Sequence, residues 1–345
     1  MNSLVVIEKN EATFSRHAVS SLPILILHAH TSCNCRCVMC DIWKNRESRS
    51  FSPVDLERML PAIRRLHVKW IVLSGGEPLL NPEWPVLCRI LKKEGIRVTL
   101  LTSGLLLEKC ASRIVDAVDE VIVSLDGPAR IHDLIRQIHS GFALIERGIA
   151  AIRRLTPKFR ITARSTVQKL NYLHLRETVK TAKNLNLNGI SFLAADLTSQ
   201  AFNRPVPWTE GRQQDIGLTQ RELFGLEEEI ELLIREHTEE IACGFVAESP
   251  EKLRRIASRF RESLALARPE SPVCNAPWTS AVIETDGTVR PCFFHQPVGT
   301  IRNGDLEKVV NGRAAISFRS SLDLASNPIC NRCVCSLNYR EGNPP

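Results

Sequence analysis

Short apolar runs alternate with amphipathic segments between residues 24 and 210. The apolar runs are rich in Val, Ile and Leu, which is typical of strands buried on both faces of a parallel sheet. In the segments between them, apolar residues recur at the three- and four-residue spacing of helices that cover such a sheet. Six strands are predicted, at Ile24–Ala29, Trp70–Gly75, Arg97–Gly104, Glu120–Gly127, Arg160–Gln168 and Gly189–Asp196. Helices are predicted between them, at Pro53–Leu66, Trp84–Glu94, Leu105–Val118, Phe142–Leu155 and Tyr172–Leu185.

This alternation predicts an α/β fold whose parallel sheet curves into a partial (β/α)6 TIM-like barrel. In such folds, the chemistry lies at the C-terminal ends of the strands. Every predicted strand ends in a polar segment, and the six segments are "TSCNCRCVMC", "SGGEP", "TSG", "SLDG", "QKLN" and "AAD". We therefore expect one rim of the barrel to gather all of them.

The pattern changes after the sixth strand. Ala195–Arg212 is rich in Pro, Asn and Thr and predicts a long loop, and helices are predicted at Thr219–His237 and Pro250–Arg268. The segment "AVIETDGTVRPC" predicts a hairpin with Asp286 and Gly287 in its tight turn. We therefore divide the chain into an N-terminal extension (1–22), the barrel (23–215), a helical connector (216–272) and a small C-terminal α+β domain (273–345).

Composition and charge narrow the class of protein only slightly. The 345 residues are 43% hydrophobic, which is enough for a sizeable core, and they carry a net charge of +7. No segment is typical of a targeting peptide or a membrane span, so we expect a cytoplasmic protein without membrane contact. The most basic segment, Glu251–Arg268, repeats apolar residues at helical spacing. This spacing favours a solvated helix face over a nucleic-acid surface for its arginines.

Twelve cysteines in a chain without an export signal indicate metal binding or redox chemistry rather than disulfides. Cys33, Cys37 and Cys40, in the loop after the first strand, have the spacing C-x3-C-x2-C. Three thiolates at this spacing can bind three irons of a [4Fe–4S] cluster and leave the fourth iron without a protein ligand. Cys35 breaks the spacing, so we expect it to be a bystander. A zinc site is the alternative, although zinc usually takes two C-x2-C pairs.

On these motifs the sequence resembles the radical S-adenosylmethionine (radical SAM) superfamily. The cysteine loop after strand one is the signature of that superfamily, "SGGEP" matches its motif for the SAM amino group, and "SLDG" matches its ribose-contacting position. "GPARIHDLIR" continues as in members with additional clusters, which place an arginine like Arg136 near the SAM carboxylate. The residue before the last cysteine is usually aromatic, whereas here it is Met39, whose soft side chain can fill the same space.

The resemblance implies a cofactor site in which the amino and carboxylate groups of SAM bind the open iron. Reductive cleavage of SAM then gives a 5′-deoxyadenosyl radical that abstracts a hydrogen atom from the substrate. An electron donor such as flavodoxin or ferredoxin is implied as a partner. The implied SAM-contacting residues are Gly75, Gly76, Glu77, Pro78, Ser103, Ser124, Asp126, Arg136 and Asn171.

The late cysteines resemble the C-terminal SPASM/twitch extension of one branch of this superfamily. Cys274-x12-Gly287-x4-Cys292 matches its opening, and Cys330-x2-Cys333 follows. A complete SPASM domain would continue with further cysteines, whereas Tyr339 stands at the next ligand position. This favours the shorter twitch form with one auxiliary [4Fe–4S] cluster, held by Cys274, Cys292, Cys330 and Cys333. A structural zinc is the alternative, and Cys335 could replace Cys330 or Cys333 as a ligand.

Candidate catalytic residues are less clearly marked. Asp196, at the tip of strand six, could orient the substrate or act as a base, or it could cap a loop. Side chains alternate between the two faces of strand five, and that of Arg164 could point into the barrel. His28 and His30 share a face of strand one, where either could touch the substrate or serve a structural role.

The sequence thus predicts a radical SAM enzyme that completes a net oxidation with an auxiliary cluster. Because no space remains before strand one for a peptide-recognition domain, a small-molecule or sugar-like substrate is favoured over a peptide. Three alternatives remain: an enzyme that modifies peptides or proteins, a radical SAM enzyme that acts on RNA, and a non-catalytic zinc- or iron–sulfur-binding interaction protein.

Overall fold

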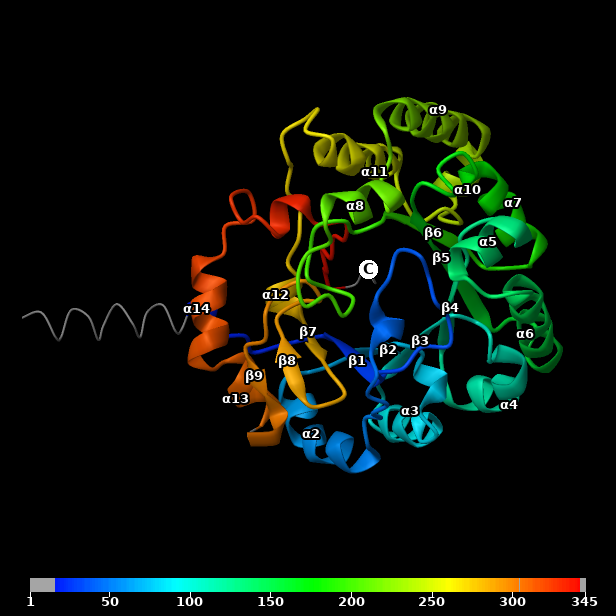
Figure 1. Cartoon of the computed structure of the whole chain (residues 1–345). Helices are drawn as coiled ribbons and strands as arrows, with labels where there is room; N and C mark the ends of the chain where they lie inside the picture. The colour runs from blue at the N-terminus through cyan, green and yellow to red at the C-terminus, as the bar shows by residue number, and fades with distance from the viewer. Residues whose placement is uncertain (1–15, 304, 342–345) are drawn as a thin grey trace, which may run out of the picture.

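The computed structural model describes residues 16–303 and 305–341, and its strands form one curved sheet (Figure 1). The strand order is β6-β5-β4-β3-β2-β1-β7-β8-β9. The first six strands pair in parallel with their sequence neighbours, so the predicted six-stranded α/β partial barrel is confirmed. These strands are β1 (Ile24–His30), β2 (Trp70–Gly75), β3 (Arg97–Thr102), β4 (Glu120–Ser124), β5 (Arg160–Val167) and β6 (Ile190–Ala194).

Helices connect the strands and cover the outer side of the arc (Figure 1). Ser52 caps the first of these helices, because its side chain accepts the backbone N–H of Asp55. Of the barrel helices α2 to α7, only α5 was not predicted; it has eight residues and follows directly on β4 and the "DGP" turn. The helices of the barrel are α2 (Pro53–Arg65), α3 (Trp84–Lys93), α4 (Leu107–Ala117), α5 (Ala129–Arg136), α6 (Gly141–Leu155) and α7 (Leu175–Asn184).

The C-terminal hairpin extends the sheet of the barrel. β7 (Ser280–Ile283) pairs in parallel with β1, and β8 (Thr288–Arg290) and β9 (Gly299–Thr300) follow in antiparallel order. Gly287 has φ +85°, a left-handed conformation that suits the predicted turn. The hairpin is therefore confirmed, and one continuous sheet carries both groups of cysteines. The helices around it are α12 (Ala276–Thr279), α13 (Leu306–Val310) and α14 (Arg313–Ser321).

The connector packs along the opposite edge of the sheet. The backbone N–H of Ile190 donates to the carbonyl of Phe245 at 2.7 Å, and the N–H of Ala247 donates to the carbonyl of Ile190 at 2.9 Å. The connector therefore adds a short parallel pairing beyond β6. Helix α8 (Glu210–Ile216) ends where the connector begins, and the helices of the connector are α9 (Gln220–Glu236), α10 (Thr238–Ala242) and α11 (Pro250–Ser263).

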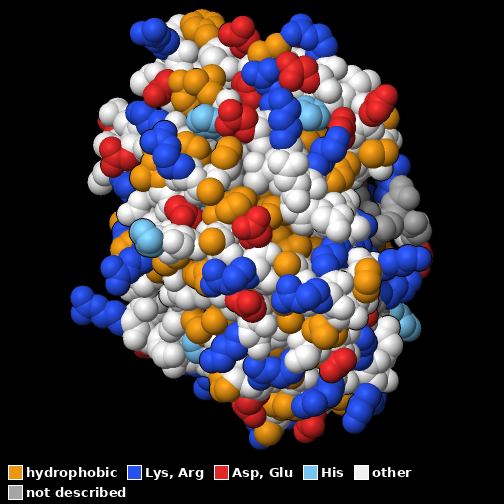
Figure 2. All heavy atoms as spheres, turned by 90° about the vertical axis from the view of Figure 1, so that its right-hand side faces the viewer, with side chains coloured by type: hydrophobic (Ala, Val, Ile, Leu, Met, Phe, Trp, Pro, Cys, Tyr) orange, Lys and Arg blue, Asp and Glu red, His pale blue; other side chains and the backbone are white. Residues whose placement is uncertain are grey.

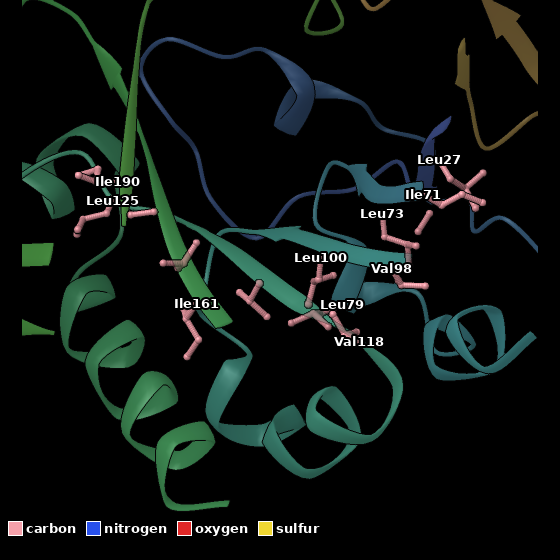
Figure 3. Close-up of a cluster of buried hydrophobic side chains, with 14 of the residues drawn as sticks. Leu27, Ile71, Leu73, Leu79, Val98, Leu100, Val118, Leu125, Ile161 and Ile190 are labelled. Atoms are coloured by element: carbon pink, nitrogen blue, oxygen red, sulfur yellow. The ribbon is translucent and has the colours of Figure 1, made fainter. Parts of the chain in front are cut away.

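The main core lies between the strands and the covering helices (Figure 3). Leu73, Leu100 and Ile161 are completely buried there. Burial alternates along β5, where Ile161, Ala163, Ser165 and Val167 are buried and the residues between them are not. Since successive side chains of a strand point to opposite faces, Arg164 lies on the inner face of the barrel, as predicted.

The surface charge is dispersed on the face drawn in Figure 2, where Lys and Arg side chains alternate with acidic and apolar ones. In α11, the apolar residues Leu253, Ile256 and Phe260 are buried, as the periodicity predicts. Arg259 of the same helix is also buried, and its charge is compensated by Glu262, with which it pairs at 2.7 Å. Among the described residues, no helix has the length and apolar character needed to cross a membrane.

Candidate functional site

The three thiols of the C-x3-C-x2-C motif lie together at the end of β1. Each of their sulfurs faces an N–H group, which is the environment that stabilises a metal-bound thiolate. The donors are the backbone of Cys35 to Cys33, the guanidinium of Arg136 to Cys37 at 3.5 Å, and the backbone of Ile42 to Cys40 at 3.4 Å. The donor set therefore fits an iron–sulfur cluster.

Cys35 differs from these three residues. Its thiol donates a hydrogen bond to Cys37, and this contact lowers the pKa of Cys37 against the effect of burial, with further help from Arg136. The same contact, followed by burial, raises the pKa of Cys35. Cys35 is therefore the thiol of this loop that keeps its proton most strongly, which agrees with the predicted role of a bystander.

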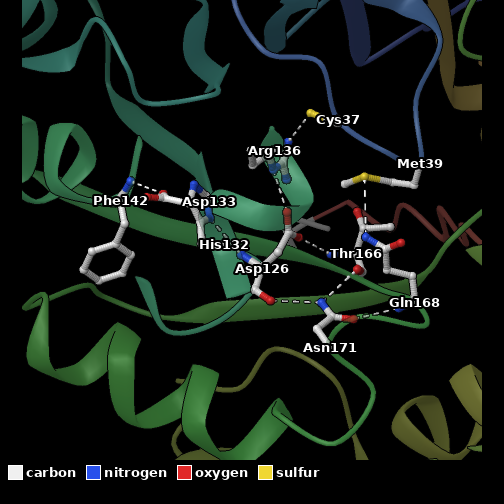
Figure 4. A network of polar contacts seen from close by, with 10 residues as sticks. All are labelled: Cys37, Met39, Asp126, His132, Asp133, Arg136, Phe142, Thr166, Gln168 and Asn171. Carbon is white, nitrogen blue, oxygen red and sulfur yellow. Dashed lines mark hydrogen bonds and ion pairs between the residues drawn. The ribbon is translucent and has the colours of Figure 1, made fainter. Parts of the chain in front are cut away.

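Helix α5 fixes the cysteine loop from one side (Figure 4). The backbone carbonyls of Ile135 and Arg136 accept the N–H groups of Val38 and Arg36 at 3.0 and 3.2 Å. The side chain of Arg136 donates to Asp126 at 2.6 Å, in a pair that is 12% and 0% exposed. Burial opposes the charge of Arg136, but Asp126 and Cys37 outweigh it and raise its pKa. A permanent positive charge is thus held beside Cys37.

The "SGGEP" loop lies directly against the cysteine loop. The N–H of Gly76 donates to the carbonyl of His30 at 2.8 Å, and the N–H of Glu77 donates to that of Ser32 at 2.9 Å. A Cβ at Gly76 would collide with the carbonyl oxygen of Ser32, and Gly75 has φ +121°. These glycines therefore permit the close approach of two chain segments, besides leaving their backbone open towards the cavity described below.

Several side chains that were predicted to contact SAM form hydrogen bonds with other residues of the protein instead. Glu77 is completely buried and accepts hydrogen bonds from Thr102, from Leu79 and from both the N–H and the hydroxyl of Ser103. Burial raises the pKa of Glu77, although these donors oppose the shift. Glu77 thus ties the tips of β2 and β3 together, which gives it a positioning role.

Asp126 and Asn171 form a similar connection between β4 and β5 (Figure 4). One oxygen of Asp126 accepts from Arg136, and the other accepts from the N–H of Thr166 at 2.8 Å. The amide of Asn171 donates to the backbone carbonyls of Asp126 and Thr166 and accepts from the N–H of Gln168. Their side chains hold together the tips of β4 and β5, next to Ser124, and Asp126 also holds Arg136 at the end of α5.

A second segment grips the cysteine loop from the other side. We call the side chains of Asn203, Arg204, Trp208 and Arg212 the clasp. They donate to the backbone carbonyls of Asp41, Met39 and Val38 and to the carboxylate of Asp41. The sequence predicts only a long loop over this stretch, because these contacts have no local periodicity. The only local signal is the presence of Arg and Trp in a proline-rich segment.

Arg204 is the centre of the clasp. Its guanidinium lies 3.6 Å from the ring centroid of Trp208 and pairs with Asp196 at 2.7 Å. The other oxygen of Asp196 accepts from the N–H of Ser199, whose hydroxyl also donates to the carboxylate. These partners favour a structural role for Asp196 over that of a free base.

The late thiols gather next to the hairpin and also face N–H groups. Burial and neighbouring thiols raise the pKa of Cys292 to about 11 and that of Cys330 to about 12. The donors are the backbone of Ala276 to Cys274 at 3.5 Å, the backbones of Phe294 and His295 to Cys292, and the backbone of Cys335 to Cys333. His295 Nε2 lies 3.2 Å from the sulfur of Cys330, and the tautomer of the ring decides which of the two is the donor. These four thiols fit a second cluster.

Cys335 has a different environment from the four thiols. Desolvation raises its pKa, Asp196 adds to this shift, and Arg164 opposes it. The sulfur of Cys335 receives no N–H from the residues that the structure describes, which favours the four-thiol set without Cys335.

No three His, Cys, Asp or Glu side chains within residues 16–303 and 305–341 lie close enough together to hold a single metal ion. A zinc ion needs all its ligands around one centre, whereas each thiolate of a [4Fe–4S] cluster binds a different iron.

A cavity of about 740 Å³ opens between the barrel rim and the C-terminal hairpin. Gly75, Gly76 and His28 line it from the strands, and the ring of Phe293 stands 5.8 Å from that of His28. Burial and the nearby Arg290 lower the pKa of His28 to about 4, so this ring is neutral at pH 7. Neither Arg164 nor Asp196 lines this cavity.

A partial barrel whose mouth carries grouped thiols beside a cavity is typical of iron–sulfur enzymes. Two family models match the chain: "Radical SAM superfamily" at residues 29–182 and SPASM, "Iron-sulfur cluster-binding domain", at residues 274–334. The chain belongs to the radical SAM superfamily and carries a C-terminal SPASM domain. Members hold a [4Fe–4S] cluster with SAM, and the SPASM domain implies at least one auxiliary iron–sulfur cluster.

Curated relatives match parts of the chain. An "AdoMet-dependent heme synthase" of Methanosarcina barkeri is 30% identical over 178 residues, which are 49% of each protein. A "Probable GTP 3′,8-cyclase" of Methanococcus vannielii is 35% identical over 102 residues, which are 27% of this chain and 33% of the relative. The chain thus spans at most about half of the length of these two relatives.

Solved structures share the fold over most of the chain. The structure described as "Native anSMEcpe with bound AdoMet" has a TM-score of 0.65 at 19% identity, covering 88% of this chain and 84% of its own. Streptococcus suis SuiB bound to the precursor peptide SuiA has a TM-score of 0.63 at 16% identity, covering 93% and 72%. At these identities the likeness is one of fold.

Proposed function

We propose that the chain reductively cleaves SAM at a [4Fe–4S] cluster held by Cys33, Cys37 and Cys40 and oxidises a substrate bound in the adjoining cavity. The observation that carries this proposal is the position of the three N–H-facing thiols beside Arg136 and beside the glycines that line the cavity. When bound, SAM and its cluster supply a 5′-deoxyadenosyl radical that removes a substrate hydrogen atom, and one auxiliary cluster supplies an acceptor for the electron left on the substrate.

The residues of this chain position and shield that chemistry. Arg136 places a positive charge where the SAM carboxylate would bind, and the backbone of Gly75 and Gly76 is open on the cavity side. The clasp and α5 hold the cysteine loop from two sides. Cys274, Cys292, Cys330 and Cys333 would hold the auxiliary cluster.

The substrate would lie in the cavity between His28, the clasp segment and Phe293. A volume of about 740 Å³ suits a small molecule or a few residues of a peptide. The inner-face position of Arg164, which the structure leaves exposed, makes it our candidate for a substrate contact deeper in the barrel. Asp196 is the weaker candidate because Arg204 occupies it.

Anaerobic reconstitution tests the proposal. The wild-type chain should bind about eight irons and form 5′-deoxyadenosine from SAM with dithionite. The Cys37→Ala variant should keep the irons of the auxiliary cluster but form no 5′-deoxyadenosine. A chain that binds only zinc, or whose product formation survives in Cys37→Ala, would contradict the proposal. Fractions of cell extract below and above the size of a short peptide, added separately, should show which class of substrate increases turnover.

A further inference from the structure

His295 is held in a fixed orientation among the late thiols. The side chain is 5% exposed, and its ring packs edge-on against Phe318 of α14 with the centroids 4.7 Å apart. Arg290 donates to its backbone carbonyl at 3.0 Å, and its own N–H donates to the sulfur of Cys292. The packing of the ring and the two backbone contacts leave it little freedom to turn.

The ring of His295 points at a second thiol. Its Nε2 atom lies 3.2 Å from the sulfur of Cys330, which comes from a distant part of the chain and is itself 9% exposed. A thiolate bound to iron has no proton to give, so a hydrogen bond at this distance requires the N–H of the histidine as donor. Among the described contacts to the late thiols, this is the one in which a side-chain nitrogen is the donor.

We propose that His295 donates a hydrogen bond from Nε2 to the Cys330 thiolate of the auxiliary cluster and raises the reduction potential of that cluster. Reduction adds negative charge to a cluster, and an N–H aimed at a ligand sulfur stabilises that added charge. The reduced form thus gains more from the bond than the oxidised form does. This inference rests on the proposed auxiliary cluster and assigns its tuning to a residue that is not itself a ligand.

The role matters for the proposed reaction. An auxiliary cluster can accept an electron from a substrate radical more readily if its potential is higher. His295 lies five residues after the end of β8 and one residue after Phe294, which lines the cavity. The same short segment therefore contacts the cavity, Cys292 and Cys330.

The test uses the full chain with Cys33, Cys37 and Cys40 all replaced by alanine, so that only the auxiliary cluster is reconstituted. The reduced fraction is followed by electron paramagnetic resonance during a redox titration. At the midpoint of this parent chain, His295→Leu should lower the ratio of reduced to oxidised cluster about tenfold, which is a shift of about 59 mV for one electron. His295→Gln, whose amide can also donate, should restore most of the ratio.

His237→Leu is the matched control, because His237 is also 5% exposed but lies beside Glu240 on α10. It should leave the midpoint unchanged. Equal midpoints in the parent chain and in His295→Leu, with about four irons in each, would overturn the proposal.

A second measurement keeps His295 in place, so it remains informative even if the leucine variant fails to bind its cluster. With 15N-labelled histidine, the reduced auxiliary cluster should show a hyperfine coupling to one histidine nitrogen. No such coupling would also overturn the assignment of His295. A parent chain that binds no iron would instead refute the auxiliary cluster itself, and with it that part of the proposed function.

Discussion

We expect the buried ion pair between Arg204 and Asp196 to be required for the stability of the clasp. The two side chains are 1% and 5% exposed, and Arg204 also stacks on Trp208 and donates to Met39. The substitution Arg204→Met keeps most of the volume and an apolar contact with Trp208 but removes the guanidinium, its charge and all its hydrogen bonds. It leaves the carboxylate of Asp196 buried with only Ser199 as a partner.

The expected cost follows from the burial of both partners. Removing one member of a buried pair leaves an uncompensated charge, which costs about 3–5 kcal/mol. Unfolding entropy is about 2.1 cal/mol/K per residue near the melting temperature. For 345 residues, this converts the cost into a decrease of about 4–7 °C in melting temperature. The double variant with Asp196→Asn should lose much less than the sum of the two single losses.

Anaerobic thermal unfolding of the reconstituted chain, followed by fluorescence, measures this effect. Arg254→Met serves as the control, because Arg254 pairs with Glu231 on the surface, where both side chains are about half exposed. It should cost less than about 1 kcal/mol. If Arg204→Met melts at the wild-type temperature, or if the losses of the double variant are additive, the reasoning from a buried charge pair is refuted.

Three further predictions follow from individual residues. Burial raises the pKa of the Glu248 carboxyl group to about 7, so the folded chain binds this proton more tightly than the unfolded chain does. The folded state therefore loses stability as the pH rises from about 4.5 through 7. The variant Glu248→Gln should melt at a higher temperature than the wild type at pH 8.5 but close to the wild type at pH 5. Gly76→Ala should weaken SAM binding at least tenfold in equilibrium dialysis, because its Cβ would push the cysteine loop away, whereas Gly211→Ala, with open space around it, should bind like the wild type. Cys35→Ala should keep both the iron content and the formation of 5′-deoxyadenosine, and loss of either would make Cys35 a ligand.

The barrel could be predicted because its strands are buried on both faces and therefore form continuous apolar runs. The local pattern also marked the hairpin through Asp286 and Gly287. The parallel pairing of β7 with β1 could not be predicted in this way, since it joins segments about 250 residues apart and leaves no trace in local periodicity. The short helix α5 was missed because its eight residues give too few turns to establish a period.

Of the candidate site, the two groups of thiols could be predicted, because the spacing of the cysteines along the chain marks them. What spacing cannot reveal is which side chains the protein uses for itself. Glu77, Asp126 and Asn171 belong to motifs of the superfamily, yet their polar atoms bind neighbouring strand tips. Arg204 and His295 act across long sequence separations, so only the folded chain brings them to Met39 and Cys330.

The central claim is that Cys33, Cys37 and Cys40 hold a cluster with one iron open to SAM. Electron paramagnetic resonance of a reduced chain whose late thiols Cys274, Cys292, Cys330 and Cys333 are replaced by alanine tests it most directly. The account predicts a spectrum of one [4Fe–4S] cluster that changes when SAM is added and that shows coupling to nitrogen-15 in the SAM amino group. A cluster whose spectrum is the same with and without SAM, or a site occupied by zinc alone, would contradict it.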